Sequence, residues 1–173
     1  TRDAAARSFP LSAAAANPCP GLGAPHMLAG MPDSAPALTL SLHPSMAEIP
    51  RAEWDACAGD GNPFVSHAFL QALEESGSAV GRTGWLPQHA ALRDAAGELV
   101  ACCPMYAKSH SQGEYVFDYG WADAYERAGG SYYPKLQVCA PFSPVPGPRL
   151  LVRPGSGVGV AALGQGLVQA CEQ

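Results

Sequence analysis

Two largely apolar segments joined by a short turn constrain the fold of this chain most. Residues 88–93 and 98–107 read as strands, and Asp94-Ala95-Ala96-Gly97 lies between them. Asp can start such a turn, and Gly can adopt the left-handed conformation within it. The region therefore predicts an antiparallel β-hairpin.

The segment before the hairpin predicts one strand and two short helices. Residues 38–42 (LTLSL) alternate apolar and polar side chains, which favours a strand with one buried face. Pro50 can begin a helix, because the N–H that it lacks is not needed in the first turn, and Gly59 ends that helix. Ser66 is a suitable N-cap for a second helix that stops at Gly77. The buried faces are expected to hold Trp54, Cys57 or Ala58, Phe69, Leu70 and Leu73.

The segment after the hairpin predicts two further helices and two further strands. A helix is expected over 119–128, strands over 135–140 and 149–153, and a last helix from near Val158. Its buried stripe would consist of Val160, Leu163, Leu167 and Cys171. The sequence PFSPVPGP at 141–148 is rich in proline, which fixes φ and removes backbone donors, so we expect a stiff loop that walls a cleft.

Composition excludes several classes of protein. Ten Lys and Arg against fifteen Asp and Glu give a net charge of -5 without a basic run, which disfavours general nucleic-acid binding. The six cysteines lack metal-ligand spacing, so we expect no metal site and a reducing, cytoplasmic location. No apolar run is long enough to span a membrane, and no signal peptide is evident.

The first 36 residues are biased towards Ala, Pro and Gly, and Met27 and Met31 lie just before the first patterned segment. We therefore expect residues 1–36 to be a disordered or non-native N-terminal extension, and residues 37–173 to form one domain.

Candidate site residues gather between Lys108 and Arg149, where eight of the aromatic residues alternate with charged ones. Buried charge needs a partner or a ligand, so this mixture predicts a binding site. Glu114, Asp118 and His110 are the candidate catalytic bases. Side chains that could bind a substrate by stacking, hydrogen bonding or charge are Lys108, Trp121, Asp123, Tyr132, Tyr133, Lys135, Phe142 and Arg149. The alternative is that the aromatics fill a core while the charges form ion pairs and helix caps.

The order of these residues resembles that of the FemAB-like predicted N-acyltransferases, which belong to the wider GNAT-type group. The similarity is carried by NPFVSHAFLQALEESGS at 62–78, GWLPQHAAL at 84–92, KSHSQGEYVFDYGWADAYERAGG at 108–130 and YYPKLQVCAPFSPVPGPRLLV at 132–152. The resemblance implies an α/β, GNAT-like half-domain with a mixed, mainly antiparallel sheet flanked by helices. It also implies transfer of an acyl or aminoacyl group to an amine, on a small-molecule or peptidoglycan-precursor acceptor.

The same resemblance bears on the donor and on the extent of the chain. No cofactor would be tightly bound, and acyl-CoA or aminoacyl-tRNA would be the donor substrate. Gly155, Gly157 and Gly159 follow a predicted strand, as the carrier-binding glycines do in GNAT-type enzymes, but Ser156 stands where that pattern has a glycine. The family arrangement implies that this chain is the N-terminal half, with the second half missing, and that it is inactive alone.

Two alternatives stay open at this point. The chain could be a non-catalytic module that recognises a peptidoglycan-like peptide or sugar through the aromatic segment. It could also be an unfolded or oligomeric remnant, in which case the sheet would expose a large apolar face.

Overall fold

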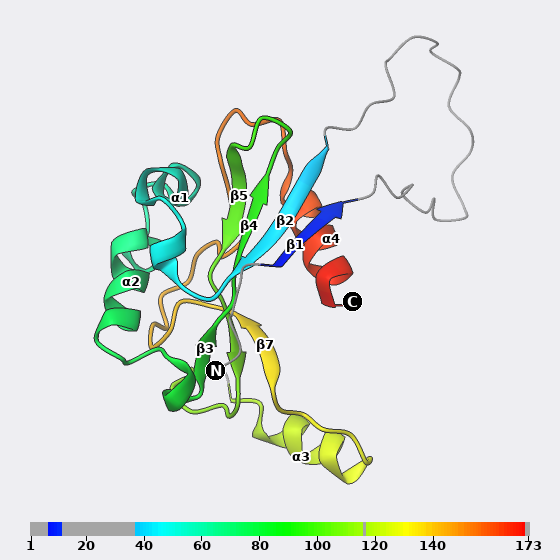
Figure 1. Ribbon diagram of the computed structural model, residues 1–173. Coiled ribbons are helices and arrows are strands. Elements are labelled where there is room, and N and C mark those ends of the chain that lie inside the picture. The colour runs from blue at the N-terminus through cyan, green and yellow to red at the C-terminus, as the bar shows by residue number, and fades with distance from the viewer. Residues whose placement is uncertain (1–6, 12–36, 116, 172–173) are drawn as a thin grey trace, which may run out of the picture.

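A computed structural model describes residues 7–11, 37–115 and 117–171 and places them in two antiparallel sheets flanked by helices (Figure 1). Within this part of the chain the larger sheet has the order β1-β2-β4-β5-β8 and the smaller one the order β3-β6-β7. Every strand pairing in both sheets is antiparallel. The strands are β1 (Arg7–Leu11), β2 (Leu38–His43), β3 (Trp85–Pro87), β4 (His89–Arg93), β5 (Leu99–Cys103), β6 (Met105–Lys108), β7 (Lys135–Val138) and β8 (Leu151–Val152).

The predicted hairpin is present as β4 and β5, and its turn has the expected chemistry. Asp94 Oδ1 accepts hydrogen bonds of 2.9 Å from the backbone N–H groups of Ala96 and Glu98. Gly97 has a φ of 83°, in the left-handed region that glycine adopts without strain. At the end away from the turn, the pairing is interrupted at Gln88 and Pro104. Beyond this break the same two segments pair again in the smaller sheet as β3 and β6. One long hairpin therefore belongs to both sheets.

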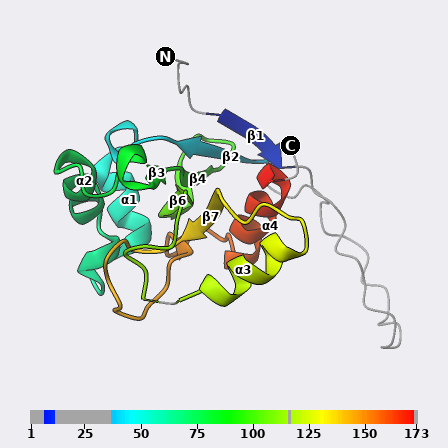
Figure 2. The ribbon, with the colours of Figure 1, turned by 90° about the horizontal axis from the view of Figure 1, so that it is seen from below.

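The larger sheet is the middle of three layers. Helices α1 (Arg51–Ala58) and α2 (His67–Glu75) cover one face, and α4 (Val160–Cys171) covers the other, as the view along the layers shows (Figure 2). Short 3-10 helices, η1 (Met46–Glu48), η2 (Pro63–Val65) and η3 (Gly81–Thr83), lie in the connections. Ser66 caps α2 as predicted, accepting a hydrogen bond of 3.3 Å from the backbone N–H of Phe69.

The buried faces of the helices follow the predictions for α1 and differ for α4. Trp54 and Cys57 of α1 are buried. On α4 the predicted stripe is right for Leu163 and partly right for Leu167, whereas Val160 and Cys171 are exposed. The face of the helix that packs on the sheet runs instead through Leu163, Gly166, Leu167 and Ala170.

The expectation of no regular structure over residues 1–36 is wrong for residues 7–11. These residues form β1, which pairs in register with β2 from Arg7 opposite Leu42 to Leu11 opposite Leu38. An edge strand is held by backbone hydrogen bonds, which composition does not report, and a proline such as Pro10 is tolerated there. The rest of the expected N-terminal extension lies outside the described residues.

The smaller sheet and helix α3 (Tyr119–Arg127) extend beyond the three layers at one end of the molecule (Figure 1). Of the α3 residues, Ala122 alone is buried. Within the described residues, no helix is long and apolar enough to cross a bilayer. The same residues contain no group of His, Cys, Asp and Glu that could hold a metal ion.

Candidate functional site

The smaller sheet carries a row of three residues on one face, one from each strand. Trp85 of β3 lies opposite Lys108 of β6, and Lys108 lies opposite Lys135 of β7. Residues paired in this way project from the same face of a sheet. The Lys108 ammonium nitrogen is 3.1 Å from the centre of the Trp85 ring, a cation–π contact. These are the only two lysines in the chain.

Glu114 binds both ammonium groups. Its Oε1 lies 3.4 Å from Lys108 Nζ and its Oε2 lies 2.8 Å from Lys135 Nζ. The side-chain amide of Gln137, in the orientation that its neighbours require, donates to both oxygens at 2.9 and 3.1 Å. The Glu114 side chain is 4% exposed, and Lys108 is fully buried and also donates to the carbonyl of Gln112 at 3.0 Å. Both carboxylate oxygens of Glu114 are therefore paired, and the ammonium groups balance its charge.

Asp118 is the second carboxylate on Lys135. Its Oδ2 is 2.5 Å from Lys135 Nζ and accepts a 2.8 Å hydrogen bond from the hydroxyl of Tyr132. Burial opposes ionisation of Asp118, but the hydrogen bonds from Lys135 and Tyr132 outweigh it and lower its pKa to about 2. Burial likewise opposes the charge of Lys135, whose pKa is nevertheless raised by Asp118 and Glu114. We call Lys108, Glu114, Asp118, Tyr132 and Lys135 the lysine cluster.

Ser111 and Tyr133 complete the surroundings of Lys135. The third ammonium hydrogen goes to Ser111 Oγ at 2.9 Å, and this hydroxyl shares a 2.7 Å hydrogen bond with the hydroxyl of Tyr133. All three donors of Lys135 are thus engaged. Burial lowers the pKa of Lys108, and Glu114 opposes this shift.

Two cavities adjoin the lysine cluster, and Glu114 and Gln137 belong to the walls of both. The first, of about 280 Å³, is open and is lined by Glu114, Asp118, Tyr132, Lys135, Leu136 and Gln137. The second, of about 180 Å³, is more enclosed and mainly apolar, with Trp85, Phe142 and Arg149 among its lining residues. The two cavities therefore meet at this central carboxylate.

The proline-rich loop forms part of the wall of the second cavity. Phe142 has a φ of 57°, unusual for a residue with a side chain, and its ring packs on Trp85 with the ring centres 5.1 Å apart. Arg149 donates from its guanidinium to the carbonyls of Val145, Gly147 and Pro148 at 2.6 to 3.2 Å. Arg149 therefore fastens its own loop, besides lining the cavity.

Several predicted site residues are not brought to the lysine cluster. Trp121 is 77% exposed on α3, and Asp123 pairs with Arg127 on the exposed surface of the same helix. A single helix cannot turn all its side chains to one side, and Asp118 at its start is the residue that faces the cluster. His110 lies against Gly84 and accepts a 3.1 Å hydrogen bond from the backbone of Gln112.

The glycine loop also lies elsewhere. Arg153, just before Gly155, Gly157 and Gly159, pairs with Glu98 at 2.6 Å. Glu98 precedes β5, whereas Lys108 ends β6, so the loop and the lysine cluster are at opposite ends of the long hairpin.

Sequence reasoning missed Trp85 and Gln137. Trp85 could have been found by extending the hairpin register, because the pairing of Ala90 with Cys103 continues in step to Trp85 with Lys108. Gln137 is two residues beyond Lys135 on β7 and therefore on the same face.

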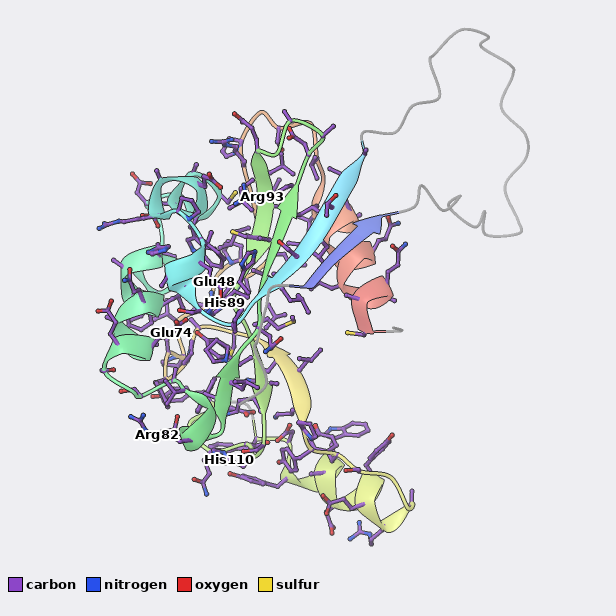
Figure 3. All side chains as sticks on the ribbon, viewed as in Figure 1. Glu48, Glu74, Arg82, His89, Arg93 and His110 are labelled. Carbon is purple, nitrogen blue, oxygen red and sulfur yellow. The ribbon has the colours of Figure 1, made fainter. Side chains whose placement is uncertain are left out.

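A second polar group, away from these cavities, joins α2 to the place where the two sheets meet. Glu74 accepts hydrogen bonds from His89 Nε2 at 2.8 Å and from Ser45 Oγ at 2.7 Å (Figure 3). His89 is fully buried, and its Nδ1 accepts a 3.4 Å hydrogen bond from the backbone N–H of Met105. Burial lowers the pKa of His89 despite the attraction of Glu74. His89 is therefore suited to a structural role as a neutral side chain, and its burial keeps substrate from reaching it.

The family model FemAB_like, described as peptidoglycan biosynthesis/recognition, matches residues 45–173. No curated protein and no solved structure matches the chain significantly.

Proposed function

The chain belongs to the FemAB-like family of peptidoglycan biosynthesis/recognition proteins, and we propose that it takes part in the transfer of an acyl or aminoacyl group to an amine of a peptidoglycan-precursor peptide. The observation that carries this proposal is the lysine cluster, which places two ammonium and two carboxylate groups beside an open cavity of about 280 Å³. Convergent polar groups at a concave surface are the usual mark of a ligand site.

The proposed reaction forms one bond and breaks another. The amine nitrogen of the acceptor attacks the acyl carbon of the donor, an amide bond forms, and the bond from that carbon to the carrier sulfur or oxygen breaks. The amine loses a proton and the carrier leaves with one. The protein has to hold the amine close to the acyl carbon and stabilise the negative charge that develops on the acyl oxygen.

Residues of the lysine cluster suit the binding part of this task. Lys135 stays charged, because its pKa is raised, and its ammonium could share its hydrogens with a carboxylate or an oxyanion. Asp118, with a pKa of about 2, is ionised at neutral pH and would orient a cationic amine rather than accept its proton. We infer that the proton leaves to solvent.

The donor and the wider architecture belong to the same proposal. We infer a GNAT-like arrangement and an acyl-CoA or aminoacyl-tRNA donor whose carrier is not held by the glycine loop, because that loop lies at the far end of the hairpin. We also infer a cytoplasmic location, since a reducing compartment suits the buried free thiols of Cys57, Cys102 and Cys103.

A second candidate function is recognition of the peptide without transfer. It is favoured by the state of the two carboxylates, since Glu114 is occupied by Lys108, Lys135 and Gln137 while Asp118 is a weak base. A pKa of about 2 leaves Asp118 without the proton affinity that efficient general-base catalysis requires near neutral pH, and the oxygens of Glu114 are already paired.

Mass spectrometry of the peptide together with calorimetry would separate these functions. The purified chain is mixed with a peptidoglycan stem peptide and, in separate reactions, with acetyl-CoA or alanyl-tRNA. A mass increase on the peptide supports transfer, and binding without any product supports recognition alone. Lys135→Gln should weaken binding, whereas Arg51→Gln, at an exposed ion pair on α1, should leave it unchanged. If the peptide neither binds nor reacts, the proposal is wrong.

A further inference from the structure

We propose that the group entering the 280 Å³ cavity carries an ammonium and a carboxylate on the same carbon, as an α-amino acid end does, rather than an amine alone. This inference rests on the proposed function, because it names the chemistry of the acceptor that binds there. It follows from how the charges of the lysine cluster are layered.

The lysine cluster has an inner and an outer pair of charges. The inner pair is Lys108 and Glu114, whose side chains are 0% and 4% exposed. The outer pair is Lys135 and Asp118, whose side chains are 15% and 16% exposed. A ligand can therefore reach one ammonium and one carboxylate, and both belong to residues that line the same cavity.

The formal charges of the lysine cluster cancel, since two lysines face two carboxylates. A ligand group with a single charge would leave one outer residue facing a like charge in a partly buried setting, which is unfavourable. An ammonium alone would approach Lys135, and a carboxylate or phosphate alone would approach Asp118. A group with both charges satisfies each outer residue with its opposite.

The geometry of the outer pair favours two charges held close together. Lys135 Nζ and Asp118 Oδ2 are 2.5 Å apart, so their ligand partners have to be neighbours as well. Tyr132 adds a hydroxyl beside the same carboxylate. Asp118 Oδ1 is buried and has no hydrogen-bond partner among the described residues, and a ligand N–H would recover the free energy that this costs.

The test compares two stem peptides that differ by one carboxylate. In the first the third residue is lysine, whose side chain ends in an amine. In the second it is meso-diaminopimelate, whose side chain carries a carboxylate on the amine-bearing carbon. Calorimetry with the purified chain should show the second peptide binding about tenfold more tightly, the gain expected when a charged carboxylate replaces the neutral Ser111 hydroxyl as an acceptor of Lys135.

Two variants assign the effect to the outer pair. Lys135→Gln should abolish the preference, because the added carboxylate loses its partner. Asp118→Asn should weaken both peptides and keep the preference, because both carry the ammonium. Arg51→Gln, distant from the site, is the matched control.

The outcomes separate this inference from the proposed function. Equal affinity of the wild-type chain for the two peptides overturns the inference and leaves the proposed function standing. A preference that survives Lys135→Gln in a folded variant also overturns it. Failure of both peptides to bind wild type overturns the proposed function and the inference together. The wild-type comparison decides even if a variant does not fold.

Discussion

Lys108 and Lys135 lie directly opposite each other on β6 and β7, and a single carboxylate, that of Glu114, bridges both ammonium groups. Like charges at opposed positions of a sheet destabilise it unless a counter-charge is supplied. Glu114 supplies that charge from the segment that follows β6. The pairing of β6 with β7, whose residues line both cavities, is therefore coupled to the carboxylate that borders both of them.

The first prediction concerns this carboxylate. Glu114→Gln should lower the free energy of unfolding by about 3–5 kcal/mol, the range for breaking a buried ion pair by removing one partner. Glu98→Gln removes an exposed partner of Arg153 and should cost about 1 kcal/mol or less. Urea denaturation of both variants measures the difference. Equal small losses would mean that Glu114 does not hold the two lysines together.

The second prediction is a pH dependence of stability. The pKa of Asp118 is lowered from 3.8 to about 2 in the folded chain, so its ion pair stabilises the fold above pH 4. That contribution should be lost as the pH falls from about 4 to about 2. Other carboxylates also titrate there, so the measurement is the difference in stability between wild type and Asp118→Asn across this window. A difference that stays constant with pH would contradict the prediction.

The third prediction uses the scarcity of lysine. A mild acetylating reagent should modify Lys135 slowly, because its ammonium is engaged by three acceptors, and should not modify the fully buried Lys108 until the chain unfolds. Peptide mass spectrometry after timed exposure distinguishes the two sites. A bound stem peptide should protect Lys135 further. Rapid modification of Lys108 in the folded protein would refute its burial.

The fourth prediction concerns the packing of Phe142 over Trp85. Gly113 has a φ of 79°, and a Cβ built on it would lie 2.7 Å from the Phe142 ring. Gly113→Ala should therefore destabilise the chain and displace that ring. Gly97→Ala is the control, because Gly97 also has a positive φ but open space around it, so it should show only the backbone cost of about 1–2 kcal/mol.

Urea denaturation and tryptophan fluorescence test this pair of variants. The change in fluorescence should be confined to Gly113→Ala, since Trp85 lies beside that residue. If the two variants lose the same stability and have identical spectra, the close approach of Phe142 to Gly113 does not affect the free energy of unfolding.

Local chemistry made much of the larger sheet predictable. The Asp94 turn, the Ser66 cap and the apolar faces of the hairpin and of α1 follow from neighbouring residues, and the structure confirms them. β1 was missed, because its pairing with β2 joins segments separated by about 30 residues of sequence, and no local pattern shows which distant segment a strand will pair with.

The sequence predicted which residues belong to the candidate site better than it predicted how they are arranged. Lysine is rarely buried, so nothing local indicated that Lys108 would lie beneath Trp85 with no exposure. Large aromatics are usually inside, so Trp121 on the exposed side of α3 ran against expectation. The position of Lys108 follows from the pairing of β6 with β3 and β7, which joins residues far apart in the chain.

The two halves of the long hairpin that runs through both sheets are under different evolutionary constraints. Its inner half, β4 and β5, is packed between α1, α2 and α4, where a change of volume disturbs the whole domain. Its outer half, β3 and β6, carries the lysine cluster beyond those layers. Substitutions at its exposed positions, such as Leu86, can accumulate without repacking the interior. We therefore expect relatives to diverge in ligand preference at this end while retaining the same three-layered body.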